Sequence, residues 1–290
     1  MDSPIRIGLP MWANAQWRGS FFPKSAPALD FLAHYASCFT TVEGNTTFHA
    51  TPDRARLVDW GASVPQGFKF CFKIPKTISH SGKLAHQIDA MNAFQNHISV
   101  LGDKLGPMFL QLPPHYDDLV DLVSLLSATK TSIPLAVELR HADFFKEGAF
   151  QRDAFQILRE LDIGFVNFVT EHLHRCVFED QDLKASQAEK PKVPSLWATT
   201  NQFAFVRYVG NPNPEQDQDG LSELARHTAR WVNQGKTAYI FVHQIPSDRL
   251  SPVIARSLSS ELANHIESLS PLAIFPAERH QPSLFNEPYL

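Results

Sequence analysis

The sequence has few cysteines, and this excludes two classes of stabilised domain. Its 290 residues contain three cysteines, Cys38, Cys71 and Cys176. Their odd number and wide separation fit neither a disulfide framework nor the ligand spacing of a zinc site. Such sparse cysteines are typical of proteins in a reducing compartment. We therefore expect a cytoplasmic protein, and we expect Cys71, inside an apolar run, to be an inert core thiol.

The chain also lacks a long hydrophobic run and a large excess of one charge. No stretch reaches the roughly 18 apolar residues typical of a membrane span, so no membrane partner is expected. The N-terminal residues carry an acid early, unlike a signal peptide. The 26 basic and 30 acidic residues give a net charge of -4, so no global basic field indicates nucleic acid binding. A local basic groove is compatible with this composition.

Short apolar runs that end in polar residues recur along the chain. Hydrophobic residues make up 43% of the sequence and include 22 phenylalanines, enough for a large aromatic core. An apolar run with an ionisable C-terminal end is typical of a buried parallel strand that leads to a site. The eight runs span residues 5–12, 39–48, 68–75, 107–113, 133–145, 163–169, 203–209 and 237–244.

Segments with helical patterning separate these runs. Apolar residues recur there at intervals of three and four, or a proline stands near a helix start. Eight strands that alternate with helices predict a single (β/α)₈ TIM barrel, with a doubly wound open sheet as the structural alternative. The segments with helical patterning are residues 51–64, 86–101, 117–126, 149–161, 221–231 and 251–269.

Three segments fall outside this alternation. Residues 13–26 form a long first loop rich in aromatic side chains, for which ordinary packing is the favoured interpretation. Residues 171–200 are polar and predict a long surface excursion between the sixth and seventh strands. The proline-rich residues after 275 predict a flexible tail. The expected organisation is therefore a barrel domain of residues 1–275 and a tail of residues 276–290.

Six strand-end motifs, in chain order, resemble those of a known family. The matching residues are Gly8-Leu9-Pro10-Met11-Trp12; Trp17, Gly19, Phe21, Phe22 and Pro23; Val42-Glu43-Gly44-Asn45-Thr46-Thr47-Phe48-His49; Lys73, Pro75, Ile78, Ser79 and His80; Gln111-Leu112-Pro113-Pro114; and Val137-Glu138-Leu139-Arg140-His141. The chain resembles the YecE-like family of TIM-barrel proteins of unknown function (domain of unknown function family 72). In a seventh motif, Val206 to Gly210, Val209 stands where the family has histidine. The resemblance implies a TIM barrel and no particular activity.

In a TIM barrel, chemistry is found at the C-terminal ends of the strands. Glu43 and Glu138 could form a carboxylate pair for acid–base catalysis, with His80 or His141 as the acid. The alternative is that each glutamate pairs with a neighbouring cation and fills the barrel. We expect three cations to bind an anion, and four further side chains to contact the substrate. The cations are Lys73, Arg140 and Arg207, and the further residues are Trp12, Asn45, Gln111 and His243.

The histidines could also bind a divalent metal. His80, His141 and His243, with Glu43 or Glu138, supply suitable ligand types. No tight ligand spacing such as His-x-x-x-His supports such a site, so the sequence leaves the metal and any other cofactor unknown.

The tail carries a separate motif. Gln281-Pro282-Ser283-Leu284-Phe285 resembles the pentapeptide that binds the bacterial sliding clamp. In such a peptide, Leu284 and Phe285 would enter an apolar pocket while Gln281 forms hydrogen bonds beside it. Two functions are thus predicted. The first is an enzyme that acts on a phosphate-bearing or other anionic substrate, a nucleic acid included. The alternative is a non-catalytic binding protein recruited to partners such as the sliding clamp.

Overall fold

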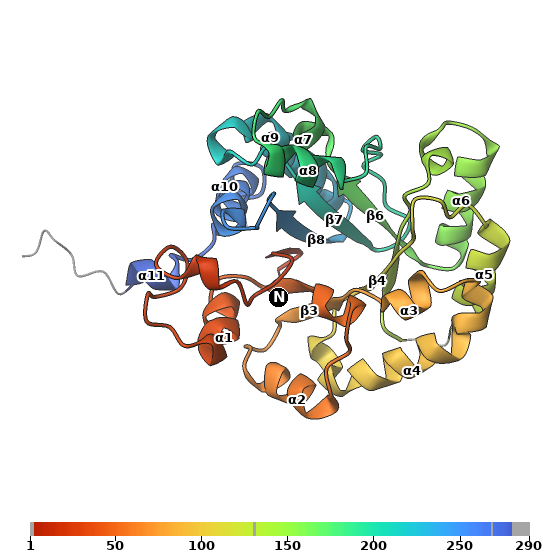
Figure 1. Ribbon diagram of the computed structural model, residues 1–290, viewed down its shortest axis with the longest axis horizontal. Coiled ribbons are helices and arrows are strands. Elements are labelled where there is room, and N and C mark those ends of the chain that lie inside the picture. Colours follow the sequence, from red (N-terminus) through yellow and green to blue (C-terminus); the bar gives the residue numbers. More distant parts are fainter. Residues whose placement is uncertain (1–2, 130–131, 268, 280–290) are drawn as a thin grey trace, which may run out of the picture.

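The computed structural model describes residues 3–129, 132–267 and 269–279, and shows parallel strands surrounded by helices (Figure 1). The strands are β1 (Ile5–Gly8), β2 (Thr41–Gly44), β3 (Lys69–Phe72), β4 (Met108–Gln111), β5 (Leu135–Glu138), β6 (Gly164–Val169), β7 (Phe203–Val209) and β8 (Thr237–His243). The helices are α1 (Phe31–Ala36), α2 (Arg54–Ala62), α3 (Lys76–Ser79), α4 (Ile88–Ile98), α5 (Leu119–Ala128), α6 (Ala149–Glu160), α7 (Glu171–Arg175), α8 (Gln181–Ala188), α9 (Gln218–Asn233), α10 (Ser251–Ala263) and α11 (Pro276–Arg279).

The strands pair as two parallel sheets. Six strands are paired in the order β1-β8-β7-β6-β5-β4, and β2 pairs with β3. The prediction of an α/β fold with a parallel sheet is confirmed. The closed eight-stranded ladder expected from the sequence is not formed among the described residues, because single hydrogen bonds replace ladders at both junctions between the sheets.

The two junctions have identifiable local causes. Between β1 and β2, the amides of Thr40 and Glu43 donate to the carbonyls of Ile7 and Leu9 at 3.3 and 3.0 Å. The hydroxyl of Tyr35 lies between Leu9 N and Thr41 O, where it accepts from the amide at 2.7 Å and donates to the carbonyl at 2.8 Å, so these two backbone groups do not meet directly. Between β3 and β4, Gly106 N donates to Phe70 O at 2.8 Å and Ile74 N to Phe109 O at 3.0 Å. Pro107 stands between these two contacts and has no N–H to donate.

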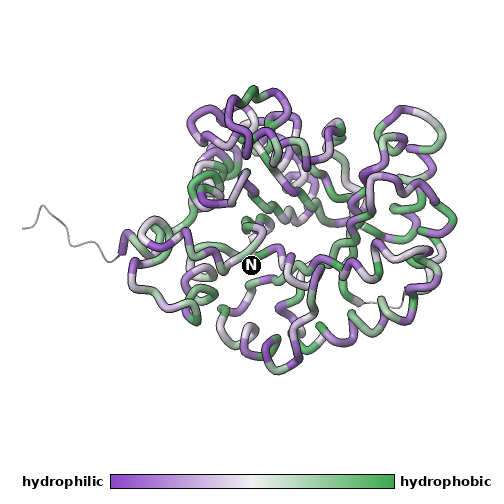
Figure 2. The backbone as a smooth tube through the Cα atoms, viewed as in Figure 1, coloured by the Kyte–Doolittle hydropathy of each residue, from purple (hydrophilic) through white to green (hydrophobic). Residues whose placement is uncertain are grey.

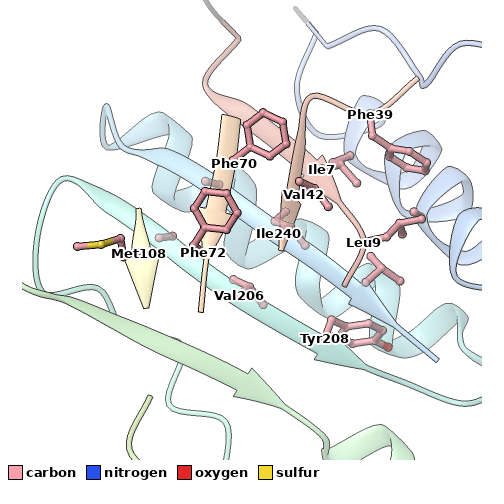
Figure 3. Close-up of a cluster of buried hydrophobic side chains, with 14 of the residues drawn as sticks. Ile7, Leu9, Phe39, Val42, Phe70, Phe72, Met108, Val206, Tyr208 and Ile240 are labelled. Atoms are coloured by element: carbon pink, nitrogen blue, oxygen red, sulfur yellow. The ribbon is translucent and has the colours of Figure 1, made fainter. Parts of the chain in front are cut away.

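Side chains alternate between two hydrophobic layers. Those that point into the lumen form one cluster, made of Cys71, Phe109, Ala136, Val166, Phe203, Phe205, Tyr239 and Phe241. Residues one position away point outward and pack beneath the helices, as period-two alternation requires. Figure 3 shows part of this outer cluster, in which Phe70 and Phe72 stand near Val42 and Met108. The lumen is therefore a packed core, as in TIM barrels.

The outer helices cover the strands with one face each. Figure 2 shows hydrophobic residues concentrated along the central strands, while the helices alternate between hydrophobic and hydrophilic positions. In α9, for example, Leu221, Leu224 and Ala225 are buried at helical spacing. In α6, Ala154, Phe155 and Leu158 are buried in the same way. This is the patterning from which the helices were predicted.

The first loop and the excursion are more ordered than predicted. In the first loop Trp17, Phe21 and Phe22 are fully buried, which confirms the interpretation as core packing. The segment between β6 and β7 contains α7 and α8, and two bonds tie it to the body at Asn167. Its Nδ2 donates to Ala198 O, and its Oδ1 accepts from Ala198 N, both at 2.9 Å.

The C-terminal region divides at Arg279. Residues of α11 pack on the body, since Ala277 N donates to Phe21 O at 3.0 Å and Glu278 forms a bidentate ion pair with Arg256. The first four residues of the predicted tail therefore belong to the body. The pentapeptide at 281–285 lies outside the described residues. No helix in the described part of the chain combines the length and apolar character needed to cross a membrane.

Candidate functional site

A charged layer lies directly above the hydrophobic lumen core at the C-terminal ends of the strands. Alternate residues of a strand share a face, so Arg207 follows Phe205 on β7 and His243 follows Phe241 on β8. The charged layer comprises Glu43, Lys73, Gln111, Glu138, Arg207 and His243, with Asn45 and Arg140 just beyond the ends of β2 and β5. All eight were predicted as site residues, and the fold brings them together.

Arg207 is the centre of the layer and binds both glutamates. Its Nε and Nη2 donate to the two carboxylate oxygens of Glu43 at 2.8 and 2.9 Å, and its Nη1 donates to Glu138 Oε2 at 2.6 Å. The guanidinium also lies 4.8 Å from the ring centre of Phe168. Both glutamates are completely buried, and Arg207 is 5% exposed. Arg207 therefore neutralises the carboxylates instead of presenting its fork to a ligand.

Arg140 forms a second connection across the layer. Its Nε donates to Glu138 Oε1 at 2.5 Å and its Nη2 to Gln111 Oε1 at 2.8 Å. Its guanidinium lies 5.2 Å from the same Phe168 ring. The side chain is 16% exposed, and a guanidinium has five N–H donors. Arg140 can thus hold the layer together and still donate to a ligand above it.

Glu43 has two further partners. His243 Nε2 lies 3.1 Å from Glu43 Oε2, and Asn45 Nδ2 donates to Glu43 Oε1 at 2.6 Å. Asn45 falls within the run 39–48 that was predicted as one strand, but it opens a 3₁₀ turn, Asn45–Phe48. The turn nevertheless brings its amide back to the carboxylate. His243 and Asn45 thus complete the hydrogen bonding of a buried charge.

Both glutamates are held in the ionised form. Burial alone would raise the pKa of Glu43, but Arg207 and His243 beside it lower that pKa well below the ordinary value. Burial likewise opposes ionisation of Glu138, yet Arg140, Arg207 and Lys73 lower its pKa to about 2. A carboxylate this acidic is a poor general base near neutral pH. The geometry therefore favours the alternative in which the glutamates are neutralised by neighbouring cations.

Lys73 differs from the other charged groups of the layer. It is 8% exposed, and its Nζ lies 3.8 Å from the ring centre of Phe48. Its Nζ forms no ion pair or hydrogen bond with any residue that the structure describes. Burial and the nearby Arg207 and Arg140 lower the pKa of Lys73 to about 8, although Glu138 and Glu43 act in the opposite direction.

His80 and His141 lie at the margin of the layer. His80 is exposed, with Nδ1 2.7 Å from Ser79 Oγ and its ring edge-on to Phe48 at 5.3 Å. Burial of part of the ring and the charges of Lys73 and Arg140 lower its pKa. His141 caps a 3₁₀ turn, and its Nδ1 accepts from Asp143 N at 3.4 Å. Within the described residues, neither histidine contacts Glu43 or Glu138.

The predicted metal ligands do not converge. Among residues 3–129, 132–267 and 269–279, no group of three or more His, Cys, Asp or Glu side chains is arranged to hold a metal ion. His243 contacts Glu43, but that carboxylate is already occupied by Arg207. The donor set therefore fits an ion-pair network better than a metal centre.

A pocket opens beside the layer. It has a volume of about 330 Å³ and is lined by Pro10, Met11, Trp12, Ala13, Glu43, Gly44, Asn45, Thr46 and His49. Trp12 lines this pocket, and its ring packs edge-on against Trp60 at 4.7 Å. The tryptophan forms a wall held by α2, and Glu43 connects this pocket to the charged layer.

Two aromatic residues of the site were not predicted. Phe168 lies beneath both guanidiniums, and Phe48 lies beneath Lys73. Phe168 could have been found from alternation, because it shares the lumen face of β6 with Val166. Phe48 follows β2 on a turn, and no periodicity in the sequence marks its position.

Comparison with known proteins gives the chain its family. The model of the DUF72 family, described as a protein of unknown function, matches residues 6–279. The chain belongs to the DUF72 family. The UPF0759 protein YecE of Escherichia coli K12 is 29% identical over 283 residues, which cover 97% of this chain and 100% of YecE.

Solved DUF72 structures support the fold. A DUF72 family protein from Thermotoga maritima has a TM-score of 0.68 at 20% identity, and the match covers 89% of this chain and 98% of the Thermotoga chain. A DUF72 family protein from Enterococcus faecalis V583 has a TM-score of 0.67 at 17% identity, and the match covers 92% of this chain and 97% of the Enterococcus chain. At this identity the likeness shows a shared fold alone. The descriptions of the family and of these relatives name no activity or substrate.

Proposed function

We propose that this DUF72 protein is an enzyme that binds a small anionic substrate, such as a phosphate ester or a free carboxylate, above the charged layer. The observation that carries the proposal is the imbalance of charge at the strand ends. Three cations, Lys73, Arg140 and Arg207, share two carboxylates, and both carboxylates are bound by the arginines. The positive charge of Lys73 is left without a carboxylate partner in the described structure.

The division of roles differs from that expected from the sequence. Arg140 and Lys73 would contact the anion, because Arg140 is partly exposed and Lys73 has no ion pair among the described residues. Arg207, Glu43 and Glu138 would hold these groups in position. Preorganised cations in a water-poor site stabilise developing negative charge, which is a common catalytic contribution. His80, whose ring is edge-on to the Phe48 ring that also contacts Lys73, would transfer protons at the margin of the layer.

A binding experiment tests the anion site. Inorganic pyrophosphate, titrated calorimetrically at low ionic strength, should bind the wild-type protein. Arg140→Ala and Lys73→Met should each weaken binding by about ten- to a hundredfold, the range for losing a hydrogen bond to a charged group. The matched control is Arg152→Ala, which removes an exposed arginine on α6 and should leave the affinity unchanged.

Two outcomes of the pyrophosphate titration would count against the proposal. Wild-type protein that binds no pyrophosphate, or variants that all bind equally, would contradict the anion site. Melting temperatures of the variants separate lost binding from lost folding. Replacing pyrophosphate by a short oligonucleotide distinguishes a nucleic acid substrate, because a polymer would then bind much more tightly than the small anion.

The sliding-clamp motif motivates a second candidate function, that of a recruited binding protein. Gln281, Leu284 and Phe285 lie shortly after α11, which is anchored on the body by Ala277 and Glu278. A peptide of the last dozen residues should bind purified bacterial clamp, and a peptide with Leu284 and Phe285 changed to alanine should not. Absence of binding at high micromolar concentration would rule out recruitment through this motif.

A further inference from the structure

Lys73 has the surroundings of a lysine that reacts as a neutral amine. We propose that Lys73 forms a covalent imine with the carbonyl group of an anionic aldehyde or ketone bound at the charged layer. The inference rests on the proposed anion site, and it names the substrate class: a small molecule with a reactive carbonyl next to a phosphate or carboxylate.

The backbone of Lys73 is fixed on both sides. Its amide donates to Gly44 O at 3.2 Å, and its carbonyl accepts from Thr47 Oγ1 at 2.6 Å. Lys73 also forms a parallel bridge with Phe109 of β4. The amine therefore projects from a rigid strand end, which is how a nucleophile is held at a reproducible position.

The amine lies over an aromatic ring and not against an acid. Nζ is 3.8 Å from the centre of the Phe48 ring, while the nearby carboxylates of Glu43 and Glu138 are engaged by Arg207 and Arg140. A lysine that formed an ion pair would be locked in its protonated form. Desolvation next to other cations is a known way of activating a lysine for imine formation.

The charge state of Lys73 agrees with this geometry. Burial and the two arginines lower the pKa of Lys73 to about 8. About a tenth of such amines are neutral at pH 7, against fewer than about one in a thousand for an ordinary lysine with a pKa of about 10.4. The fraction able to attack a carbonyl is thus raised by roughly two orders of magnitude.

The chemistry balances without an added reagent. The lone pair of neutral Nζ attacks the carbonyl carbon, a C–N bond forms, and the carbonyl oxygen becomes a hydroxyl with a proton from the amine. The C–O bond then breaks, and the oxygen leaves as water with the second amine proton. His80 would pass this proton, because its ring is edge-on to the same Phe48 ring that lies 3.8 Å from Nζ. Arg140 would hold the anionic group of the substrate.

Reductive trapping tests the imine. The full-length protein is incubated with pyridoxal 5′-phosphate or glyoxylate and sodium cyanoborohydride, and the modified lysines are located by peptide mass spectrometry. Lys73 should be labelled faster than the exposed lysines despite being 8% exposed. Lys73→Arg should abolish the rapid phase. The matched control is Lys76→Arg, which removes an exposed lysine on α3 and should leave labelling of Lys73 intact.

Competition separates the imine from the anion site. Excess inorganic pyrophosphate should suppress labelling of Lys73 and not that of Lys76. Labelling that follows exposure alone, while pyrophosphate still binds, would overturn the imine and leave the anion site standing. Rapid labelling of Lys73 that pyrophosphate does not suppress would support the reactive amine and contradict the anion site. Neither labelling nor binding would overturn both.

Discussion

The guanidinium of Arg207 allows two buried carboxylates to share one layer of the lumen. Three of its nitrogens each donate to a different carboxylate oxygen, two on Glu43 and one on Glu138. A lysine could not replace it, because an ammonium lacks the planar fork that binds carboxylates in this way. Like charges this close would otherwise force one carboxyl group to keep its proton.

This arrangement predicts a dependence of stability on acid pH. The pKa of Glu138 is about 2 in the folded protein and 4.5 is its ordinary value, so between these values the unfolded chain binds more protons. Its contribution to stability is complete above about pH 4.5 and is lost as the pH falls toward 2. The free energy of unfolding, measured by urea titration across this window, should decrease with falling pH.

Two variants identify the residue responsible. Glu138→Gln removes the titrating group and should reduce the slope between pH 4.5 and 2, at the cost of lower stability at pH 7. Glu147→Gln removes an exposed glutamate and should keep the wild-type slope. An unchanged slope in Glu138→Gln would mean that other groups carry the acid sensitivity.

At the scale of elements, the eight strands were predictable because apolar runs and their polar ends are local signals. The residues at which the strands end could not be predicted from these signals. The run at 39–48 was predicted as one strand, but β2 ends at Gly44 and a 3₁₀ turn, Asn45–Phe48, follows. The run at 133–145 ends as a strand at Glu138. In both cases the turn after the strand still buries a side chain, Thr47 in the first and Phe144 in the second, so burial does not mark where the strand ends.

The excursion between β6 and β7 shows a second limit of local patterning. Helices α7 and α8 have few buried residues, so no apolar periodicity marked them. Contact with α9 adds to the hydrogen bonds at Asn167 in ordering the segment. The ring of Trp197 stacks on His227 at 4.3 Å and 4°, and Trp197 has a positive φ of 47°. Such a conformation is an outlier for a bulky residue, and the stacked ring can hold it in place.

The membership of the charged layer was predictable, but its pairing was not. Each residue stands at the end of its strand, and parallel strands end on one side. Which cation meets which carboxylate depends on where the strands lie around the ring. Arg207 and Glu43 are 164 positions apart and come from different sheets. Local patterns in the sequence span a few residues and cannot reveal a pairing over that separation. The sequence therefore could not show that the two arginines bind the carboxylates while Lys73 has no ion pair among the described residues.

For the whole molecule, the same pair joins the two sheets. Glu43 lies on β2 of the two-stranded sheet, whereas Arg207 lies on β7 of the six-stranded sheet. Among the residues described, the backbones of β1 and β2, and those of β3 and β4, are joined by individual hydrogen bonds and not by ladders. The side-chain fork between Arg207 and Glu43, together with the contact of His243 on β8 with the same carboxylate, therefore connects the sheets across the lumen and helps to keep β2 and β3 in place.

Native-state hydrogen exchange can measure this connection. Glu43→Gln weakens the fork, so the amides of β2 and β3 should exchange faster relative to those of Val206 and Ile240 in the continuous sheet. We expect the local opening free energy to fall by about 1–3 kcal/mol, the range for a lost charge-assisted hydrogen bond. The residues to follow are those paired in the β2–β3 ladder, from Val42 with Phe70 to Gly44 with Phe72.

The control uses the second carboxylate of the same guanidinium. Glu138 lies on β5, which belongs to the same six-stranded sheet as Arg207. Glu138→Gln therefore removes a comparable buried charge without loosening the contact between the sheets. It should lower protection throughout the molecule and leave β2 and β3 unchanged relative to β7 and β8. If both variants loosen β2 and β3 to the same extent, the pair with Glu43 contributes only to overall stability, and the backbone bonds alone join the sheets.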